Sequence, residues 1–331
     1  MERFALAAAV VLGFALTAAL CSLFVPLRRV LERREQNQQP VQSEQPRPAP
    51  LRAPLWGGLC AAAGTVAAVG VGWLVACVGQ PELLGSEGRL MTRLLTALAG
   101  SLAFGAVGLA EDLARMRSPA ALGLRRDVRL LLEALAAAFV LLLLQAAGCL
   151  PRGLDVPGAG YVLLGSAVPF LWAVLMVVLA ECARIAERDE GTVCGAAFVA
   201  MLALMMAEAG LGVPGLAVLP AALAGALVAL LLWAFPPARL GVGCCGSLLA
   251  AGAIGCIPLS LDMTSLTVPL ALPFWAAGGL LAAQLLGAKR TGKPLRCWVK
   301  KHKMSPETVF LCSFALSAVG YVLALALLRW C

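Results

Sequence analysis

The sequence contains few charged residues. Only 13% of its 331 residues are Asp, Glu, Lys or Arg, whereas soluble domains contain about 25%. Hydrophobic residues make up 61% of the chain, and several apolar runs approach the roughly 20 residues that cross a bilayer as a helix. The composition therefore excludes a soluble globular domain and predicts an all-α, polytopic membrane protein.

The sequence also lacks the signatures of several kinds of site. It has 12 cysteines but no CxxC spacing, which argues against a zinc–thiolate centre unless thiols from separate loops converge. Many of the cysteines lie inside apolar runs, where Cys behaves as a small apolar residue, so no disulfide framework is expected. There is no internal repeat of the kind that marks many transporters, and His302 is the single histidine.

Hydropathy predicts ten membrane spans in the chain. Their expected positions are 4–25, 57–79, 91–110, 128–149, 161–180, 193–210, 215–234, 244–261, 267–287 and 309–328. With both termini outside, the cytoplasmic loops and their edges hold 21 of the 26 Lys and Arg residues, as the positive-inside rule requires. The net charge of +8 therefore indicates a cytoplasmic membrane face and not a nucleic-acid partner. The first span has no A-x-A cleavage site and is interpreted as a retained helix.

The chain is expected to form one membrane domain over residues 1–331. Residues 28–53 form a Gln- and Pro-rich loop whose composition cannot bury a core, so it is expected to be flexible. The second notable cytoplasmic loop, 288–308, is basic. Its Lys300, Lys301 and Lys303 could attract a phosphate, or could simply anchor the last span.

Acidic side chains follow the third and the fifth predicted spans. Glu111 and Asp112 form a pair at a helix end, where one or two carboxylates can hold Mg²⁺ together with substrate phosphates. The loop after the fifth span reads AECARIAERDEGTVCG and contains Glu187 and Glu190. For both segments, an ordinary solvated helix end or loop is the alternative.

The most specific segment is FPPARLGVGCCGSLLAAG, residues 235–252. It resembles the FPPAKxFMGDTGSLxLG signature of the polyprenyl-phosphate N-acetylhexosamine-1-phosphate transferases. The identical positions are Phe235, Pro236, Pro237, Ala238, Gly243, Gly246, Ser247 and Leu248. The pair Glu111-Asp112 similarly resembles the family's GxxDDxxxLR motif, with Arg129 and Glu133 at its downstream Lys-x-x-x-Gln, and RAPLWGGL resembles its GTPTMGG step.

The chain departs from the family pattern at several acidic or polar positions. Cys244 stands where the family has Asp. A thiol is mostly neutral at pH 7 and is a soft ligand, so it cannot simply replace a carboxylate on Mg²⁺. Glu187 and Glu190 stand for two Asp residues, Arg184 stands for an Asn, and His302 stands alone where the family has a histidine-rich motif.

The resemblance implies transfer of a phospho-N-acetyl-sugar from a UDP-sugar to polyprenyl phosphate, with Mg²⁺ and release of UMP. This reaction would take place at the cytoplasmic face of the cell membrane, in cell-wall (peptidoglycan) or polysaccharide synthesis, and the family allows a homodimer. Glu111 and Asp112 are the candidate catalytic residues, and Asp112 is the candidate metal ligand. The candidate substrate-binding residues are Arg184, Glu187, Glu190, Gly246, Ser247 and His302.

Two other functions remain open from the sequence. The chain could keep the fold without the chemistry and bind a polyprenyl lipid, a nucleotide-sugar or a partner protein, with Arg184 or Arg188 in the place of the cation. A transporter is the third class, and Glu133, Glu181 and Glu208 are its candidate intramembrane acids.

Overall fold

A computed structural model describes residues 2–38, 56–79, 88–117, 123–156, 160–163, 165, 167–187, 191–213, 215–235, 239–286 and 306–328. These segments contain eleven α-helices, one 3₁₀ turn and a short hairpin. The helices are α1 (Glu2–Gln38), α2 (Gly57–Gly79), α4 (Gly88–Arg117), α5 (Arg126–Ala146), α6 (Ala167–Ala186), α7 (Thr192–Gly210), α8 (Val218–Ala234), α9 (Gly243–Ser260), α10 (Thr267–Leu270), α11 (Leu272–Leu286) and α13 (Pro306–Leu328).

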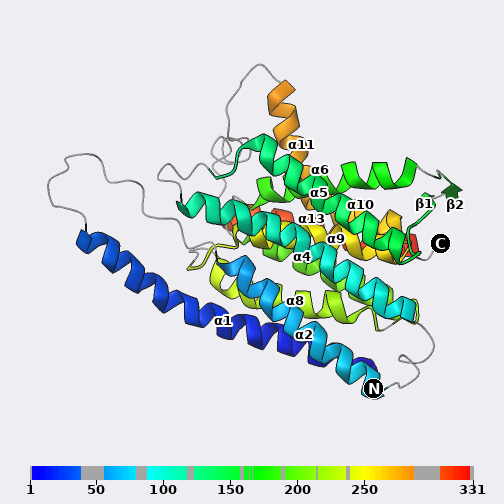
Figure 1. The fold of residues 1–331 in the computed structure, drawn as a ribbon, viewed down its shortest axis with the longest axis horizontal. Coiled ribbons are helices and arrows are strands. Elements are labelled where there is room, and N and C mark those ends of the chain that lie inside the picture. Colours follow the sequence, from blue (N-terminus) through cyan, green and yellow to red (C-terminus); the bar gives the residue numbers. More distant parts are fainter. Residues whose placement is uncertain are drawn as a thin grey trace.

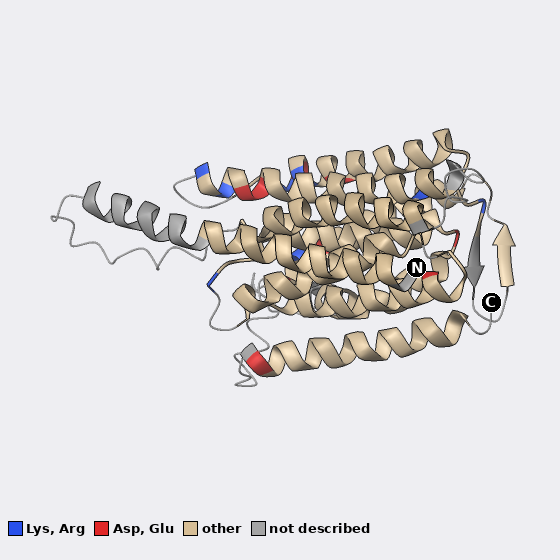
Figure 2. Ribbon diagram, turned by 90° about the horizontal axis from the view of Figure 1, so that it is seen from below, with Lys and Arg blue, Asp and Glu red and all other residues tan. Residues whose placement is uncertain are grey.

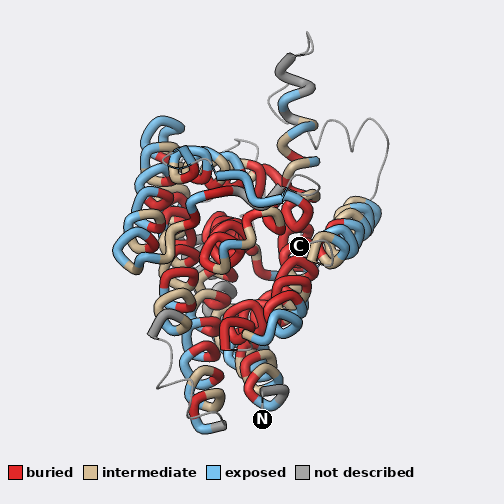
Figure 3. Tube along the Cα trace, turned by 90° about the vertical axis from the view of Figure 1, so that its right-hand side faces the viewer, coloured by how far each residue is buried: buried red, intermediate tan, exposed pale blue. Residues whose placement is uncertain are grey.

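Most of the long helices run along a common direction and form one bundle (Figure 1). The start of α1 and the end of α13 lie at the same end of this bundle. Charged residues are sparse along the helices and gather mainly toward one end (Figure 2). Buried residues line the centre, and exposed residues cover the outward faces of the peripheral helices (Figure 3).

Seven helices in the described part of the chain are long and apolar enough to cross a membrane. They are Phe4–Phe24, Gly57–Val78, Leu90–Arg117, Ala167–Ala186, Thr192–Gly210, Gly243–Ser260 and Glu307–Leu328. The shorter helix α8 is apolar as well. The chain is therefore a polytopic membrane protein, as its composition predicts, whereas ten spans and external termini remain predictions.

The structure corrects two of the expected spans. Residues 161–163, expected at the start of the span 161–180, belong instead to strand β2 (Gly160–Leu163), which pairs antiparallel with β1 (Gly153–Val156). Gly160 has a φ of 72°, which a glycine adopts without strain. The expected span 267–287 is interrupted at Ala271, between α10 and α11. Pro273 lies in the first turn of α11, where its missing N–H costs no helical hydrogen bond.

Helix α9 lies at the centre of the bundle, and every one of its residues is buried. A helix that is apolar all round is expected in such a position. Its first turn is approached very closely by two neighbours. A Cβ atom at Gly58 of α2 would collide with the backbone of Gly246, and one at Gly108 of α4 would collide with the carbonyl of Cys244. The two glycines therefore allow α2 and α4 to contact the beginning of α9.

Candidate functional site

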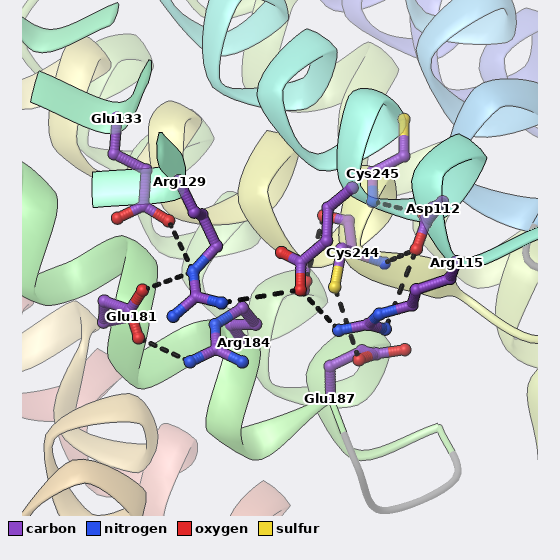
Figure 4. Close-up of polar contacts among 11 residues, drawn as sticks. Asp112, Arg115, Arg129, Glu133, Glu181, Arg184, Glu187, Cys244 and Cys245 are labelled. Atoms are coloured by element: carbon purple, nitrogen blue, oxygen red, sulfur yellow. Dashed lines mark hydrogen bonds and ion pairs between the residues drawn. The ribbon is translucent and has the colours of Figure 1, made fainter. Parts of the chain in front are cut away.

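A cluster of charged and thiol side chains lies at the end of the bundle where α4 ends and α9 begins (Figure 4). We call it the polar cluster. Helix α4 supplies an acidic pair and one Arg, α5 and α6 supply one Arg and one Glu each, the residue after α6 supplies a further Glu, and α9 supplies two thiols. Nine of its members are labelled in Figure 4: Asp112, Arg115, Arg129, Glu133, Glu181, Arg184, Glu187, Cys244 and Cys245. The tenth is Glu111, which pairs with Arg115 and Arg129.

Asp112 joins α4 to the first turn of α9. Its Oδ1 accepts the backbone N–H of Cys244 at 3.0 Å, and its Oδ2 accepts that of Cys245 at 2.9 Å. The first N–H groups of a helix have no partner within the helix. The residue that precedes α9, Val242, carries no side-chain oxygen that could cap it. Asp112 therefore supplies from another helix the cap that Ser or Asp usually supplies locally, and its charge suits the positive end of the helix dipole.

Glu111 lies beside Asp112, and one of its oxygens is bound to arginine. Its Oε1 is 2.6 Å from Nη2 of Arg115 and 3.7 Å from Nη1 of Arg129. Its Oε2 is buried and has no hydrogen-bond partner among the described residues. A buried carboxylate oxygen without a donor is unusual, and a bound ion or water is one explanation for it.

Arg129 and Arg184 share the carboxylate of Glu181. The two oxygens of Glu181 lie 2.8 Å from Nε of Arg129 and 2.6 Å from Nη2 of Arg184. Glu133, one turn after Arg129, is completely buried and lies 3.9 Å from the same Nε. The ion pair between Arg129 and Glu181 joins α5 to α6. The positive charges of Arg129 and Arg184 are thereby paired with the carboxylate of Glu181.

Glu187 follows directly after α6 and faces Cys244. The thiol of Cys244 donates to Oε2 of Glu187 at a sulfur–oxygen distance of 3.9 Å. Burial, together with the negative charge of Asp112, raises the pKa of Glu187 to about 7. Glu187 therefore exchanges a proton close to neutral pH, well above the pKa of about 4.3 that a glutamate has in water.

The structure brings four of the candidate residues together: Glu111, Asp112, Arg184 and Glu187. Gly246 and Ser247 lie in the buried first turns of α9, where the Ser247 hydroxyl donates to the carbonyl of Cys244 at 3.1 Å. Glu190 and His302 lie outside the described residues. The roles assigned to these eight residues stay predictions.

Sequence reasoning did not identify Arg115 as a member of the site. Arg115 lies four residues after Glu111 and three after Asp112, which places the three side chains on one face of α4. This spacing in the sequence could have indicated that Arg115 belongs to the site. The acidic pair Glu111-Asp112 therefore acts beside the permanent positive charge of Arg115.

Mg²⁺ can be tested against the donors of the polar cluster. No three His, Cys, Asp or Glu side chains converge as a metal site within the described segments. Mg²⁺ does not need three, because it commonly takes one or two carboxylates and completes its shell with substrate phosphates and water. The unpartnered oxygen of Glu111 meets that requirement, and the carboxylate of Glu187 lies in the same cluster (Figure 4). The residues therefore fit Mg²⁺ through Glu111, whereas both oxygens of Asp112 accept backbone amides and one oxygen of Glu187 accepts the Cys244 thiol.

Comparison with known proteins identifies the family. The model of Glycosyl transferase family 4 matches residues 94–262, about half of the chain. Phospho-N-acetylmuramoyl-pentapeptide-transferase of Mycobacterium tuberculosis (strain ATCC 25618 / H37Rv) is 27% identical over 265 residues, which cover 72% of each chain. The enzyme of the same name from Desulforudis audaxviator is 34% identical over 170 residues, 48% of this chain and 50% of the relative.

A third relative of that name, from Synechococcus sp. (strain RCC307), is 32% identical over 215 residues, 63% of this chain and 55% of the relative. The matched family region, residues 94–262, contains every described member of the polar cluster. The resemblance inferred from the motifs is thereby confirmed. The chain belongs to Glycosyl transferase family 4.

Proposed function

We propose that this protein transfers a phospho-N-acetyl-sugar from a UDP-sugar to polyprenyl phosphate and releases UMP. One observation carries the proposal: acidic residues from separate motifs meet at the first turn of α9. Asp112 and Cys244, 132 positions apart in sequence, are in direct contact. Glu187, from a third segment, contacts the same Cys244. Family membership and the relatives' printed names support the same reaction.

The chain's own residues would act mainly by position and charge. Phosphoryl transfer depends on holding the reacting groups in line and on neutralising the charge on the phosphate oxygens. Asp112 would fix the first turn of α9 against α4. Arg184 could turn from Glu181 to a phosphate, because a guanidinium binds phosphate through two parallel hydrogen bonds.

Glu187 is the candidate for handling a proton. A general acid or base works best when its pKa lies near the operating pH, and the pKa of Glu187 is raised to about 7. It would take the proton from a polyprenyl monophosphate and leave that group a better nucleophile. Glu111 would hold Mg²⁺ through its unpartnered oxygen, and the ion when bound supplies Lewis-acid stabilisation of the pyrophosphate.

The basic loop 288–308 is proposed to take part from the same end of the bundle. Its structure lies outside the described residues, except for the first turn of α13. Phe310 of that turn packs edge-on against Phe235 at a centroid distance of 5.3 Å, and a Cβ at Gly195 would contact its ring. Gly195 lies in the first turn of α7, a few residues after Glu187. In the loop that leads into this helix, Lys300, Lys301 and Lys303 are proposed, together with His302, to bind phosphate at the cytoplasmic face.

The test is UMP release by the purified full-length protein in detergent. The assay would contain Mg²⁺, undecaprenyl phosphate and a panel of UDP-N-acetylhexosamines. Release should require the lipid and should be lost in Glu111→Gln. Asp127→Asn is a matched control, because it removes a carboxylate that is 86% exposed at the start of α5. Absence of release from folded protein across the panel would overturn the proposal.

A second candidate function is binding without transfer. It is favoured by the replacement of the family's Asp with Cys244 and by the engagement of both oxygens of Asp112. In that case UDP-sugar or polyprenyl phosphate would bind to the protein in a titration, but UMP would not appear. The same preparation therefore distinguishes the two functions.

A further inference from the structure

Arg115 lies among the acidic side chains of the polar cluster, of which Glu111 would hold a divalent cation. Its Nη2 is 2.6 Å from Oε1 of Glu111, and its Nη1 is 3.9 Å from Oδ1 of Asp112. Glu187 lies on the other side of the same guanidinium (Figure 4). Three carboxylates from two segments of the chain therefore surround one arginine head group.

We propose that Arg115 competes with the divalent cation for the carboxylate of Glu111. The cation binds Glu111 tightly only after the guanidinium of Arg115 has moved away from that carboxylate. This inference rests on the metal site of the proposed function. It adds that the substrate-free protein is kept in a low-affinity state for the metal by its own side chain. A free metal ion would therefore bind the resting protein weakly.

The charges of the cluster support this inference. A guanidinium stays protonated at every accessible pH, so Arg115 cannot vacate its position by losing a proton. A dication beside Glu111 would lie within a few ångströms of that fixed charge. At such distances the repulsion between like charges is substantial even where water screens it. The ion would also have to share a carboxylate whose Oε1 already holds the arginine.

The second carboxylate oxygen of Glu111, Oε2, forms no hydrogen bond with the described residues. This oxygen is buried, and the side chain of Glu111 is only 3% exposed. A pair formed only for stability would be expected to satisfy both oxygens or to leave the second one in water. Glu111 therefore keeps a coordination position available next to the competing cation.

Arg115 has room to leave. Its side chain is 24% exposed, unlike the side chains of Glu111 and Asp112. A phosphate offers a guanidinium two hydrogen bonds in one plane and is among its strongest partners. Arrival of a phosphate-bearing substrate would thus draw Arg115 away from Glu111 and release that carboxylate to the metal.

The inference is tested by Mn²⁺ binding to the full-length protein in detergent without substrate. The free ion would be followed by electron paramagnetic resonance. We expect Arg115→Gln, which keeps a hydrogen-bond donor and so favours folding, to bind Mn²⁺ at least about tenfold more tightly than the unmodified protein. Arg115→Met should show the same gain, and Arg115→Lys, which keeps the charge, should not.

Two controls locate the effect. Arg117→Gln removes the same charge from an exposed position at the end of α4, so it should leave Mn²⁺ affinity within about twofold. Glu111→Gln added to Arg115→Gln should abolish the gain. Equal Mn²⁺ affinity in Arg115→Gln and the unmodified protein, or an equal gain in Arg117→Gln, overturns the inference.

Failure of this inference and failure of the proposed function are distinguishable. Mn²⁺ binding is measured without turnover, and UMP release is measured separately. A protein that releases UMP but gains no Mn²⁺ affinity on loss of Arg115 is a transferase without an internal competitor.

Discussion

The carboxylate of Asp112 caps helix α9 by accepting the backbone N–H of Cys244 at 3.0 Å. The same side chain accepts the next N–H, that of Cys245, at 2.9 Å. Asp112 is therefore a structural link between α4 and α9 as well as a candidate member of the active site. The two roles make different predictions for its substitution.

Replacement of Asp112 by Asn should destabilise the folded protein. The Asn amide offers one acceptor instead of two and directs an N–H group toward a backbone N–H. We expect a loss of about 1–3 kcal/mol, the usual cost of an unsatisfied buried group. Thermal unfolding in detergent would measure this loss as a lower Tm. An unchanged Tm, with Asp127→Asn as the surface control, would show that the cap contributes nothing.

The contact between α2 and α9 predicts a pair of glycine substitutions with opposite outcomes. Gly58→Ala should prevent normal packing, because the new methyl group would collide with the backbone of Gly246, which cannot rotate away. Gly70→Ala on the same helix should be tolerated, since a Cβ there meets no described atom within 4 Å. Yield of monodisperse protein and Tm would be compared. Similar behaviour of the two variants would contradict the packing.

Glu187 predicts a pH dependence of stability. Its pKa lies near 4.5 in the unfolded chain and is raised to about 7 in the folded protein. Between these two pH values the folded protein holds a proton on Glu187 that the unfolded chain has lost. The contribution of Glu187 to stability is therefore complete below about pH 4.5 and is lost as the pH rises through about 7. Glu187→Gln should remove this part of the decline in Tm. An identical slope in the variant between these pH values would disprove the assignment.

Restoring the acid of the family at Cys244 should make stability depend on metal. Cys244→Asp adds a negative charge beside Glu187 and Asp112, in a position that is completely buried. Without metal, repulsion between like charges should lower Tm. Added Mg²⁺ should then raise Tm in the variant and have little effect on the unmodified protein, because ligands that bind the folded state stabilise it. A Tm independent of Mg²⁺ would show that no cation binds beside residue 244.

Some of this architecture could be predicted from the sequence, for physical reasons that differ between elements. Long apolar runs locate helices well, because the membrane requires every backbone group to be bonded within the segment. Strand β2 was not predicted because residues 161–163 are themselves apolar and merge in the sequence with the apolar run of α6. Hydropathy alone cannot distinguish a short strand from the start of a helix.

The candidate site likewise contains features that the sequence predicts and features that it does not. The order of motifs predicted that Glu111, Asp112 and Glu187 belong together, and the structure places them in one cluster. The cap on α9 could not be predicted, since it depends on how α4 and α9 pack across 132 positions of sequence. Arg115 was detectable in principle from its helical spacing, but the spacing does not reveal which of its acidic neighbours it contacts.

The most direct test of the central claim is UMP release by full-length protein supplied with Mg²⁺, undecaprenyl phosphate and UDP-N-acetylhexosamines. We predict release that depends on the lipid, falls at least about a hundredfold in Glu111→Gln, and persists in Asp127→Asn. No release from folded protein, or release that is equal in the unmodified protein and in Glu111→Gln, would contradict the claim that the polar cluster performs phosphosugar transfer.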